Sequence, residues 1–219
     1  MTLSVKNLAI QHGEKALFSP VSFDVSPGEV FTLMGPSGCG KSTLLSAIAG
    51  HLVTDFSFSG EVTLKGTSVM ALAPDQRKIG LLFQDDLLFP HLSVLENLMF
   101  GIPRRYKGKE RVERAETTLT TIGLPQLASK QPNEISGGQR ARISLMRMLL
   151  SEPQAVLLDE PFSKLDKALR NEFRQFVFDQ IQSRQIPAIM VTHDHDDIPP
   201  QGRVLNWPWT NAVQEQPTC

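Results

Sequence analysis

A glycine-rich segment near the N-terminus has the residue types and the spacing of a phosphate-binding loop. Residues 35–43 read GPSGCGKST, which matches the pattern G-x-x-x-x-G-K-[ST]. The glycines Gly38 and Gly40 permit backbone geometry that a side chain would obstruct. The exposed N–H groups can then surround phosphate oxygens, and the helix that follows directs its positive end at them. The sequence predicts nucleotide binding by Gly35, Pro36, Ser37, Gly38, Cys39, Gly40, Lys41, Ser42 and Thr43.

The end of this segment supplies the chemistry of a nucleotide site. Lys41 can reach the β- and γ-phosphates, and the Ser42 hydroxyl can ligate Mg²⁺, which prefers oxygen ligands. The alternative is a chance match in a glycine-rich turn. Such a match arises in a chain of this length on the order of one time in a hundred, and the flanking strand and helix patterns lower that figure. We therefore adopt nucleotide binding as the interpretation.

A pair of acidic residues follows an apolar segment further along the chain. Residues 155–160 read AVLLDE and predict a buried strand that ends at Asp159 and Glu160. Ligand sites in open parallel sheets lie at the carboxyl ends of the strands. There Asp159 can hold Mg²⁺ through water, and Glu160 can orient or deprotonate the attacking water. A pair that merely faces solvent is the alternative, which the phosphate loop in the same chain disfavours.

The patterns around these residues indicate an α/β core that is interrupted by a helical segment. Short apolar or alternating runs predict strands at residues 3–10, 21–25, 29–34, 60–66, 155–159 and 188–194. The first of these runs has a slip in its alternation between Val5 and Leu8. Leu44, Leu45 and Ile48 share one face of a helix after the loop. The pattern of residues 94–150 is mostly helical.

Composition and charge limit the class of protein. The chain has 219 residues, of which 41% are hydrophobic and 21% charged, and its net charge is -1. A net charge near zero argues against nucleic acid or anionic lipid as a partner. The longest apolar runs are far below the roughly 20 residues of a membrane helix, and the N-terminus lacks a signal-peptide layout. Because two cysteines form no disulfide framework, we expect a reduced, cytosolic protein.

Four further motifs accompany the phosphate loop and the acidic pair. They are Gln84 in LLFQDD, residues 135–139 with the sequence ISGGQ, residues 163–166 with the sequence SKLD, and His193 in VTHD. With all six motifs in this order, the chain resembles the ATP-binding subunit of an ABC transporter over nearly its whole length. It is similar to the short stand-alone ATPases of bacterial importers of the thiamine, iron and polyamine type. The motifs resemble, in chain order, the Walker A, Q-loop, signature, Walker B, D-loop and switch-histidine motifs of that family.

This resemblance implies the fold of a P-loop NTPase. Such a fold has a RecA-like core with a mixed, mainly parallel sheet, an antiparallel β subdomain and an inserted α-helical subdomain. Residues 1–219 would form a single ABC ATPase domain. Residues 1–85 and 152–219 would form the core with its β subdomain, and residues 86–151 the helical subdomain that carries the signature motif.

The resemblance also implies a head-to-tail homodimer that encloses two ATP molecules. Because Walker A serves the chain's own phosphates, the helix N-terminus at Gly137 and Gly138 suits the γ-phosphate of the partner's nucleotide. A glycine-rich helix cap without a ligand is the alternative. The residues expected to bind this nucleotide in trans are Ser136, Gly137, Gly138 and Gln139, and Asp166 is expected at the interface. The implied catalytic residues are Glu160, His193, Lys41 and Gln84, and the implied Mg²⁺ ligands are Ser42, Gln84 and Asp159.

The implied function is ATP hydrolysis that energises a membrane transporter. Water would attack the γ-phosphoryl group in line, with catalysis mainly by positioning and charge neutralisation. The chain would be a peripheral subunit at the cytoplasmic face of the inner membrane. We expect no nucleic acid among its partners. An importer is favoured, with separate permease subunits and an extracytoplasmic substrate-binding protein as partners. The alternatives are the ATPase of a multi-subunit exporter, a non-transport ABC ATPase that acts on DNA or ribosomes, and a metabolic P-loop kinase, which would not account for ISGGQ or VTHD.

Two features depart from the family pattern. The aromatic residue that stacks on adenine normally stands just before Gly13, and here this residue is His12. After His193, many relatives continue with a helix that contains Glu-Ala, whereas Pro199 and Pro200 are expected to stop a helix early in this chain. Because the tail is short, we expect this chain to lack the C-terminal regulatory domain that some sugar importers carry.

Two lesser features have simpler interpretations. Cys39 lies near a helix N-terminus, where thiols are activated. We expect no catalytic role for it, but we expect alkylation there to block ATP hydrolysis and ATP to protect. Residues 104–111 read RRYKGKER, and we interpret this basic run as a solvated loop that opens a helix, in preference to a contact with nucleic acid or lipid.

Replacement of His12 tests the expected adenine contact. Because an imidazole ring offers less stacking area than a phenol ring, we predict weak, pH-sensitive nucleotide binding by the natural chain and tighter ATP binding by His12→Tyr. Titration of ATP into both proteins at several pH values measures the difference. Unchanged or weaker ATP binding by His12→Tyr would contradict the prediction and favour the alternative that His12 is an exposed loop residue.

Overall fold

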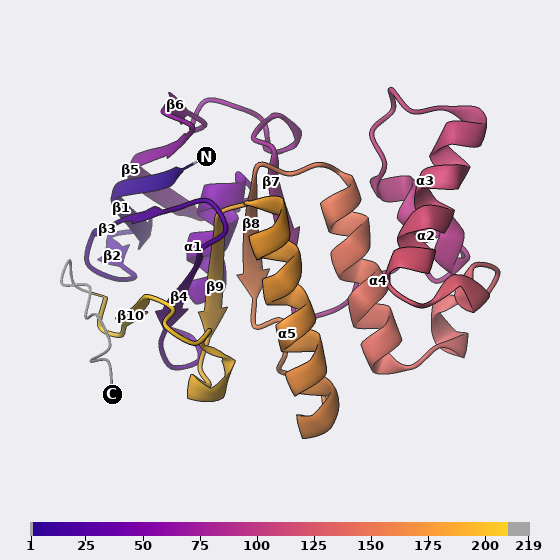
Figure 1. Cartoon of the computed structure of the whole chain (residues 1–219). Helices are drawn as coiled ribbons and strands as arrows, with labels where there is room; N and C mark the ends of the chain where they lie inside the picture. The colour runs from indigo at the N-terminus through magenta and orange to yellow at the C-terminus, as the bar shows by residue number, and fades with distance from the viewer. Residues whose placement is uncertain (1, 210–219) are drawn as a thin grey trace. The chain divides into compact units, whose positions relative to one another are not determined.

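A computed structural model describes residues 2–209 of the chain (Figure 1). The chain divides into two compact units. The first unit contains Met1–Leu81, Gln154–Glu160 and Phe178–Cys219, and the second contains Leu82–Pro153 and Pro161–Val177. Within the described residues, no helix combines the length and the hydrophobicity needed to cross a bilayer.

An antiparallel sheet in the first unit has the strand order β2-β1-β5-β6, with β3 also paired to β1. Its strands are β1 (Leu3–His12), β2 (Lys15–Ala16), β3 (Val21–Val25), β5 (Phe56–Leu64) and β6 (Thr67–Ser68). The predicted slip in the first strand is confirmed, because the register against β3 shifts between Val5 and Leu8. Asn7 has a φ of 48° at this point. The irregularity lets Leu3, Val5, Leu8 and Ile10 all be buried.

A second sheet has the strand order β10-β4-β9-β8-β7. Its strands are β4 (Val30–Met34), β7 (Ile79–Leu82), β8 (Ala155–Asp159), β9 (Ala188–Thr192) and β10 (Val204–Asn206). β4 runs parallel to β9 and β10, and β8 runs parallel to β9. Every residue of β4 and β9 is buried, which explains why these strands read as continuous apolar runs. The segments that follow β4, β8 and β9 therefore start at the same edge of the sheet.

The helix α1 (Lys41–Ala49) begins directly after the glycine-rich segment. Leu44, Leu45 and Ile48 are buried on it, as the spacing predicts. Gly40 and Gly50 cap its two ends in left-handed conformations. A helix of nine residues is short, so a large share of its backbone groups lack partners within the helix.

A buried arginine satisfies the C-terminal end of α1. Arg77 is only 5% exposed, and its Nη1 donates to the carbonyls of Ala47 and Ile48 at 3.0 and 2.9 Å. The same guanidinium donates to the carbonyls of Leu72 and Met70. A positive charge at a helix C-terminus also opposes the helix dipole. Burial lowers the pKa of the Arg77 guanidinium, and these four carbonyls compensate for its lost hydration.

The second unit is mainly helical. Its helices are α2 (Val94–Gly101), α3 (Gly108–Thr121), α4 (Gly137–Leu150) and the first part of α5 (Lys167–Arg184). α2 packs against both α3 and α4, and their buried residues include Leu98, Ala115, Leu119, Ile143 and Leu149. Single 3₁₀ turns are η1 (Pro74–Gln76) and η4 (His195–Asp197) in the first unit, and η2 (Pro125–Leu127) and η3 (Pro132–Glu134) in the second.

Residues 161–177 belong to the helical unit through their contacts. The rings of Phe162 and Phe173 pack edge to face with centroids 5.9 Å apart, and Leu169 lies against Gly138 of α4. The ranges expected from the sequence assign this segment to the core, and those subdomain boundaries remain a prediction. The expected α/β class is confirmed, with a parallel sheet, an antiparallel sheet and a helical segment.

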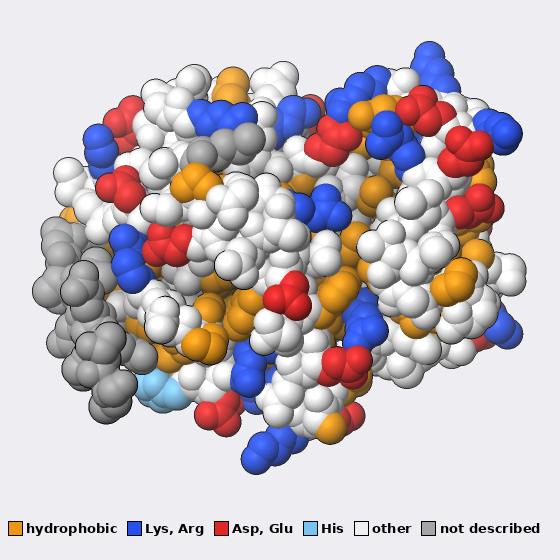
Figure 2. All heavy atoms as spheres, viewed as in Figure 1, with side chains coloured by type: hydrophobic (Ala, Val, Ile, Leu, Met, Phe, Trp, Pro, Cys, Tyr) orange, Lys and Arg blue, Asp and Glu red, His pale blue; other side chains and the backbone are white. Residues whose placement is uncertain are grey.

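Charged side chains of both signs are interspersed over the α3 region of the helical unit (Figure 2). Within the basic run 104–111, Arg105 and Tyr106 both contact Glu152. Arg114 lies 3.1 Å from Glu110, and its guanidinium also covers the ring of Tyr106. These basic residues therefore have acidic and aromatic partners within the chain.

Substitution of Arg77 tests how much the end of α1 depends on the guanidinium. Because a lysine ammonium cannot reach four carbonyls in the same geometry, we expect Arg77→Lys to lower the free energy of unfolding by about 2 kcal/mol. Urea denaturation measures this value. Arg184→Lys, on an exposed position of α5, is the matched control, with an expected change within about 0.5 kcal/mol. Equal losses in the two variants would contradict the prediction.

Candidate functional site

The glycine-rich segment connects Met34 at the end of β4 to the first residue of α1. Gly38 has a φ of 82°, and Gly40 has a φ of 98°. Such backbone angles strain any residue with a side chain. A Cβ atom on Gly35 would lie 2.7 Å from Sγ of Cys39. These three glycines therefore fit a loop that folds tightly in front of a helix N-terminus.

The Lys41 ammonium folds back over this loop. Its Nζ donates to the carbonyls of Gly35 and Pro36 at 2.8 and 3.0 Å, and it lies 3.4 Å from Oε1 of Glu160. The lysine side chain is only 5% exposed, and a buried charge costs free energy unless it is paired. The carbonyls and the carboxylate supply that pairing. Phosphate oxygens can replace the carbonyls as acceptors, because an ammonium group has three donors and no fixed direction.

Ser42 and Asp159 bring two oxygen donors together. The Ser42 hydroxyl donates to Oδ1 of Asp159 at 2.9 Å, which joins the first turn of α1 to the end of β8. Burial raises the pKa of the Asp159 carboxyl, and the hydrogen bond from Ser42 opposes this rise. A partly buried carboxylate of this kind is stabilised by a nearby cation, which favours its charged form.

Glu160 lies at the centre of the polar groups at this edge of the sheet. Its Oε1 faces Lys41, and its Oε2 lies 3.1 Å from Nδ1 of His193. The backbone N–H of Glu160 donates to the carbonyl of Val191 in β9 at 3.0 Å, and its φ of 45° is in the left-handed region. The side chain of Glu160 is mostly buried, whereas that of His193 is half exposed. The carboxylate is therefore held between the Lys41 ammonium group and the His193 imidazole ring.

The turn that carries His193 is fixed by a buried carboxylate. Asp197 is 2% exposed and accepts a hydrogen bond from the Thr192 hydroxyl at 2.8 Å. The Thr192 hydroxyl in turn accepts from the N–H of Asp194 at 3.1 Å. The residues on both sides of His193 are thereby connected to one another. The expected early stop of the helix after His193 is also confirmed, because the segment between His193 and Pro199 contains only the single 3₁₀ turn η4.

His12 lies at the end of β1 and is exposed. Its ring stacks at a tilt on that of Phe56, with centroids 4.9 Å apart, because the two residues are paired across β1 and β5. The His12 ring is thereby placed against Phe56, which is partly buried against the hydrophobic core. Phe56 was not among the expected site residues, since its proximity to His12 follows only from the strand register.

The signature residues lie at the N-terminus of α4 in the second unit. The Ser136 side chain accepts from the N–H of Gln139 at 3.3 Å, and the Gln139 side chain accepts from the N–H of Ser136 at 2.9 Å. This reciprocal pair is a capping box. Gly138 is buried, and a Cβ atom there would lie 2.5 Å from the Leu169 side chain. The second glycine therefore permits the close approach of α5, whereas Gly137 is exposed.

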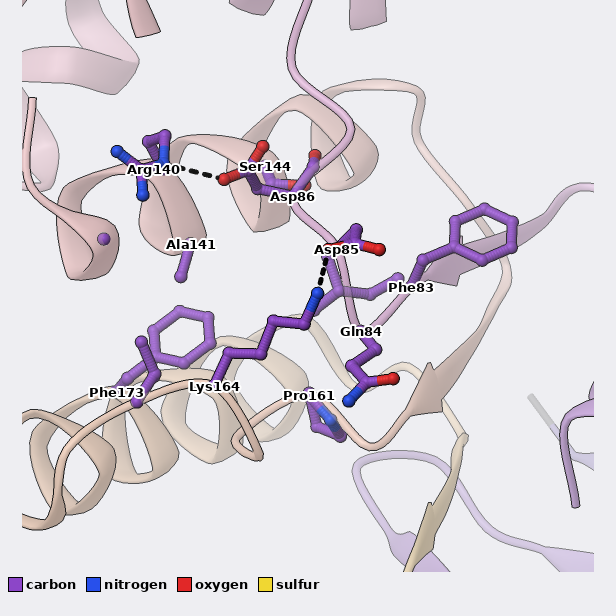
Figure 3. Close-up of a pocket in the computed structure, with 13 residues that line it drawn as sticks. Phe83, Gln84, Asp85, Asp86, Arg140, Ala141, Ser144, Pro161, Lys164 and Phe173 are labelled. Carbon is purple, nitrogen blue, oxygen red and sulfur yellow. Dashed lines mark hydrogen bonds and ion pairs between the residues drawn. The ribbon is translucent and has the colours of Figure 1, made fainter. Parts of the chain in front are cut away.

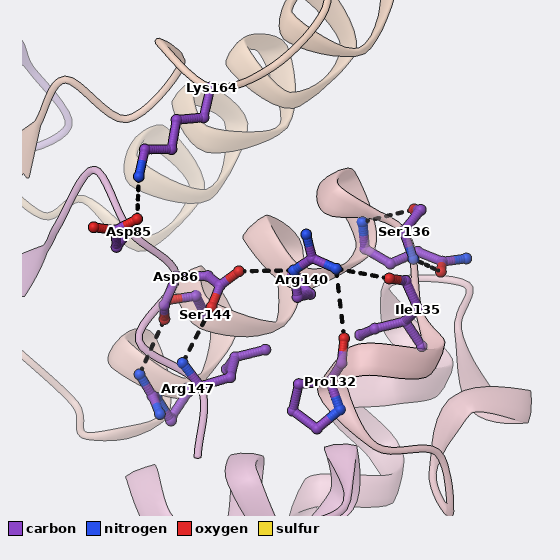
Figure 4. A network of polar contacts seen from close by, with 11 residues as sticks. Asp85, Asp86, Pro132, Ile135, Ser136, Arg140, Ser144, Arg147 and Lys164 are labelled. Atoms are coloured by element: carbon purple, nitrogen blue, oxygen red, sulfur yellow. Dashed lines mark hydrogen bonds and ion pairs between the residues drawn. The ribbon is translucent and has the colours of Figure 1, made fainter. Parts of the chain in front are cut away.

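The residues that follow Gln84 are bound to α4 by a polar network (Figure 4). Arg140 donates from Nε to Oδ2 of Asp86 at 2.9 Å and from Nη1 to the carbonyl of Ile135 at 2.9 Å. The carbonyl of Asp86 accepts from the Ser144 hydroxyl at 2.6 Å and from Arg147 at 3.3 Å. Arg140 therefore connects the segment after Gln84 with the backbone of Ile135, the first residue of the signature motif.

A cavity of about 180 Å³ adjoins this network in the same unit (Figure 3). Lys164 forms an ion pair with Asp85 beside it. Asp166, two residues later, accepts from the N–H of Leu169 at 3.0 Å and so caps the start of α5. The cavity is lined by Leu82, Phe83, Gln84, Asp85, Asp86, Gly137, Arg140, Ala141, Ser144, Pro161, Lys164, Leu165 and Phe173.

The structure thus assembles part of the expected site within each unit. The first unit brings together Lys41, Ser42, Asp159, Glu160 and His193. The second unit contains Gln84, Ser136, Gly137, Gly138, Gln139 and Asp166. Sequence reasoning missed the buried Asp197, because nothing in the run DHDDIPP distinguishes one aspartate as buried.

Cys39 does not have the activated thiol that its position in the sequence suggests. Burial raises the pKa of this thiol, and the nearby charge of Lys41 only partly opposes the rise. The side chain is packed against the hydrophobic core. Because the thiolate is the nucleophile, the expectation of an activated thiol is wrong.

The rate of Cys39 alkylation tests this correction. Because the pKa of the thiol is raised, less thiolate is present at neutral pH, and we expect the rate with iodoacetamide to keep rising with pH beyond the ordinary thiol range of about 8.5. Mass spectrometry of the tryptic peptide at a series of pH values measures the rate, with a small free thiol as the control. A rate that reaches its plateau at or below that of the control would contradict the prediction.

Comparison with known proteins identifies the family of this chain. Residues 18–163 match the family described as ABC transporter. The chain is 47% identical over 204 residues to the uncharacterized ABC transporter ATP-binding protein YnjD of Escherichia coli strain K12. The aligned region covers 93% of this chain and 94% of YnjD.

Two relatives with described import functions are also similar. The sulfate/thiosulfate import ATP-binding protein CysA of Burkholderia mallei is 43% identical, over 90% of this chain and 57% of its own length. The Fe(3+) ions import ATP-binding protein FbpC 1 of Rhizobium meliloti is 37% identical, over 97% of this chain and 60% of its own length. The chain therefore spans less than two thirds of these two importer proteins. Given the family match and the identity to YnjD, the chain belongs to the ABC transporter family, as one of its ATP-binding ATPases.

Proposed function

We propose that this ATPase hydrolyses ATP at the edge of the parallel sheet in its first unit and thereby energises a bacterial importer. The observation that carries this proposal is the placement of Glu160 between Lys41 and His193, at 3.4 and 3.1 Å. This arrangement puts a carboxylate beside the lysine that follows a glycine-rich loop. It combines the groups that phosphoryl transfer to water requires, namely a phosphate cradle, a cation and a base.

In the proposed mechanism, the loop N–H groups and the N-terminus of α1 bind the β- and γ-phosphates. The Lys41 ammonium exchanges its carbonyl partners for phosphate oxygens and offsets their negative charge. Glu160 then accepts a proton from the water that attacks the γ-phosphoryl group in line. His193, which lies beside Glu160, would contact the γ-phosphate and hold the carboxylate in place. We thus assign the function of the base to Glu160 and that of a positioning residue to His193.

The residues at the end of β8 and the start of α1 fit a bound Mg²⁺ ion. The Ser42 hydroxyl and the Asp159 carboxylate are 2.9 Å apart, and both are the hard oxygen donors that this ion prefers. Mg²⁺ commonly keeps several water ligands and is bound by one or two protein oxygens together with substrate phosphates. When bound, Mg²⁺ would neutralise part of the phosphate charge. Gln84 remains a predicted third ligand.

A head-to-tail homodimer would complete the site. Ser136, Gly137, Gly138 and Gln139 would meet the γ-phosphate bound to the partner, with Asp166 at the interface. The capping box at Ser136 supports this proposal, because it fixes the first turn of a 14-residue helix whose N-terminus favours anions. Formation of the composite site on ATP binding would make closure depend on the γ-phosphate, and hydrolysis would reverse it.

Import is the transport direction that the relatives favour. CysA, FbpC 1 and the spermidine/putrescine import ATP-binding protein PotA of Thermotoga maritima are all named for import. By analogy, the partners of this chain would be separate permease subunits and an extracytoplasmic substrate-binding protein. The chain would then lie at the cytoplasmic face of the inner membrane. The cargo differs among these relatives, so their names select no single substrate for this chain.

Replacement of Glu160 tests the proposed base and the proposed dimer together. We expect Glu160→Gln to lower the rate of ATP hydrolysis about a hundredfold or more and to accumulate an ATP-bound dimer. Phosphate release and light scattering after gel filtration, both with ATP and Mg²⁺, measure the two effects. Glu61→Gln, on an exposed position of β5, is the matched control.

The two measurements separate the two parts of the proposal. If Glu160→Gln hydrolysed ATP at the rate of Glu61→Gln, Glu160 would not be the base. If the variant lost hydrolysis but stayed monomeric with ATP and Mg²⁺, the dimer would be contradicted while the assignment of the base stood.

A further inference from the structure

We infer that Trp209 is a positioning residue for the phosphate-binding loop, so that the segment after β10 belongs functionally to the nucleotide site. This inference rests on the proposed role of residues 35–43 as the phosphate cradle. It assigns a role to part of the divergent segment that follows His193, for which the sequence suggested none. Three contacts, each to a different point of the loop or its flanks, carry the argument.

The first contact is a buried hydrogen bond at the start of the loop. Trp209 is only 1% exposed, and its indole Nε1 donates to the carbonyl of Met34 at 2.8 Å. Met34 is the last residue of β4 and directly precedes Gly35. The indole N–H therefore fixes the peptide unit that leads into the loop. A buried donor and acceptor that find each other in this way are costly to separate.

The second contact is at the other end of the loop. The Trp209 ring packs edge to face on Phe18, with centroids 5.1 Å apart. The Phe18 ring in turn faces Gly40, where an added Cβ atom would lie 3.3 Å from two ring carbons. Gly40 caps α1 and immediately precedes Lys41. Through Phe18, the indole therefore packs against the side of Gly40, the residue that sets the direction of the first turn of α1.

The third contact comes from the neighbouring tryptophan. Trp207 packs edge to face on Trp209 with centroids 5.1 Å apart. Its Cβ lies 3.2 Å from the position that a Cβ atom on Gly35 would occupy. The aromatic cluster of Phe18, Trp207 and Trp209 thus meets the first glycine of the loop and, at Gly40, the last.

This arrangement matters because anion binding depends on where the loop N–H groups point. Groups that converge on phosphate act best when the surrounding contacts hold them in place before the ligand arrives. The simpler interpretation is that Trp209 only fills the hydrophobic core, of which it is a member. The two interpretations differ in one respect, because a phenylalanine ring can fill the core but cannot donate a hydrogen bond.

The test is therefore Trp209→Phe, compared with Phe23→Leu. Phe23 is a buried residue of the same core, and it packs on Phe31 of β4, so its truncation lowers stability without removing the Met34 hydrogen bond. We expect Trp209→Phe to weaken ATP and ADP binding about threefold to tenfold, the effect of one lost hydrogen bond. Phe23→Leu is expected to change both affinities less than about twofold, for a similar loss of stability in urea. Calorimetric titration of both nucleotides at a temperature where all proteins are folded measures the affinities.

A spectroscopic readout covers the case in which Trp209→Phe does not fold. The chain contains two tryptophans, so Trp207→Phe leaves Trp209 as the sole indole. We expect ATP to shift the emission of Trp209 in this variant, because the charges of the bound phosphates change the electric field at the loop whose backbone the indole N–H contacts. An emission spectrum unaffected by saturating ATP would overturn the inference.

The binding data distinguish failure of the inference from failure of the proposed function. Affinities for Trp209→Phe equal to those of the natural chain, or reduced no more than in Phe23→Leu, would overturn the inference alone. A natural chain that bound neither nucleotide would overturn the phosphate cradle and the inference with it. Weaker binding by Trp209→Phe, with Phe23→Leu unchanged, would support the role of the indole N–H.

Discussion

The buried charge of Lys41 is the constraint on which the rest of the first unit depends. An ammonium group that is 5% exposed has to find acceptors within the protein, since the loss of hydration is otherwise too costly. Two loop carbonyls and the Glu160 carboxylate provide them. These acceptors directly follow β4 and β8, two strands that are distant in sequence. The parallel order of β4, β9 and β8 brings them together, and this compensates the buried charge of the lysine. The site and the sheet are therefore stabilised together.

The backbone groups at both ends of α1, the short helix after the loop, have a partner or a proposed ligand outside the helix. At its N-terminus, the backbone N–H groups are directed at the place proposed for phosphate. At its C-terminus, Arg77 occupies the carbonyls of Ala47 and Ile48. A cation there and an anion at the opposite end both stabilise the helix dipole. The arginine thus gives a helix of nine residues a fixed position from which its first turn can act.

The sequence predicts the parts of this protein that depend on local spacing. The order of strand, glycine loop and helix around Lys41 follows from turn chemistry and apolar periodicity, and Asp159 is expected at a strand end for the same reason. What depends on pairing between distant segments cannot be read in this way. The stacking of Phe56 on His12 requires the register of β1 on β5. The pKa of Cys39 requires knowledge of what buries its thiol, and the position of Cys39 near a helix N-terminus suggested the opposite reactivity.

The hydrogen bond between Trp209 and Met34 has a consequence for how each chain folds during its synthesis. Its partners are 175 residues apart in the chain. Contacts of such separation form late, because the entropy of closing a long loop has to be overcome first. During translation, the residues that cradle phosphate emerge from the ribosome long before the indole that fixes them. A nascent chain therefore lacks the hydrogen bond that holds the start of this loop until residue 209 has emerged and can fold back onto Met34.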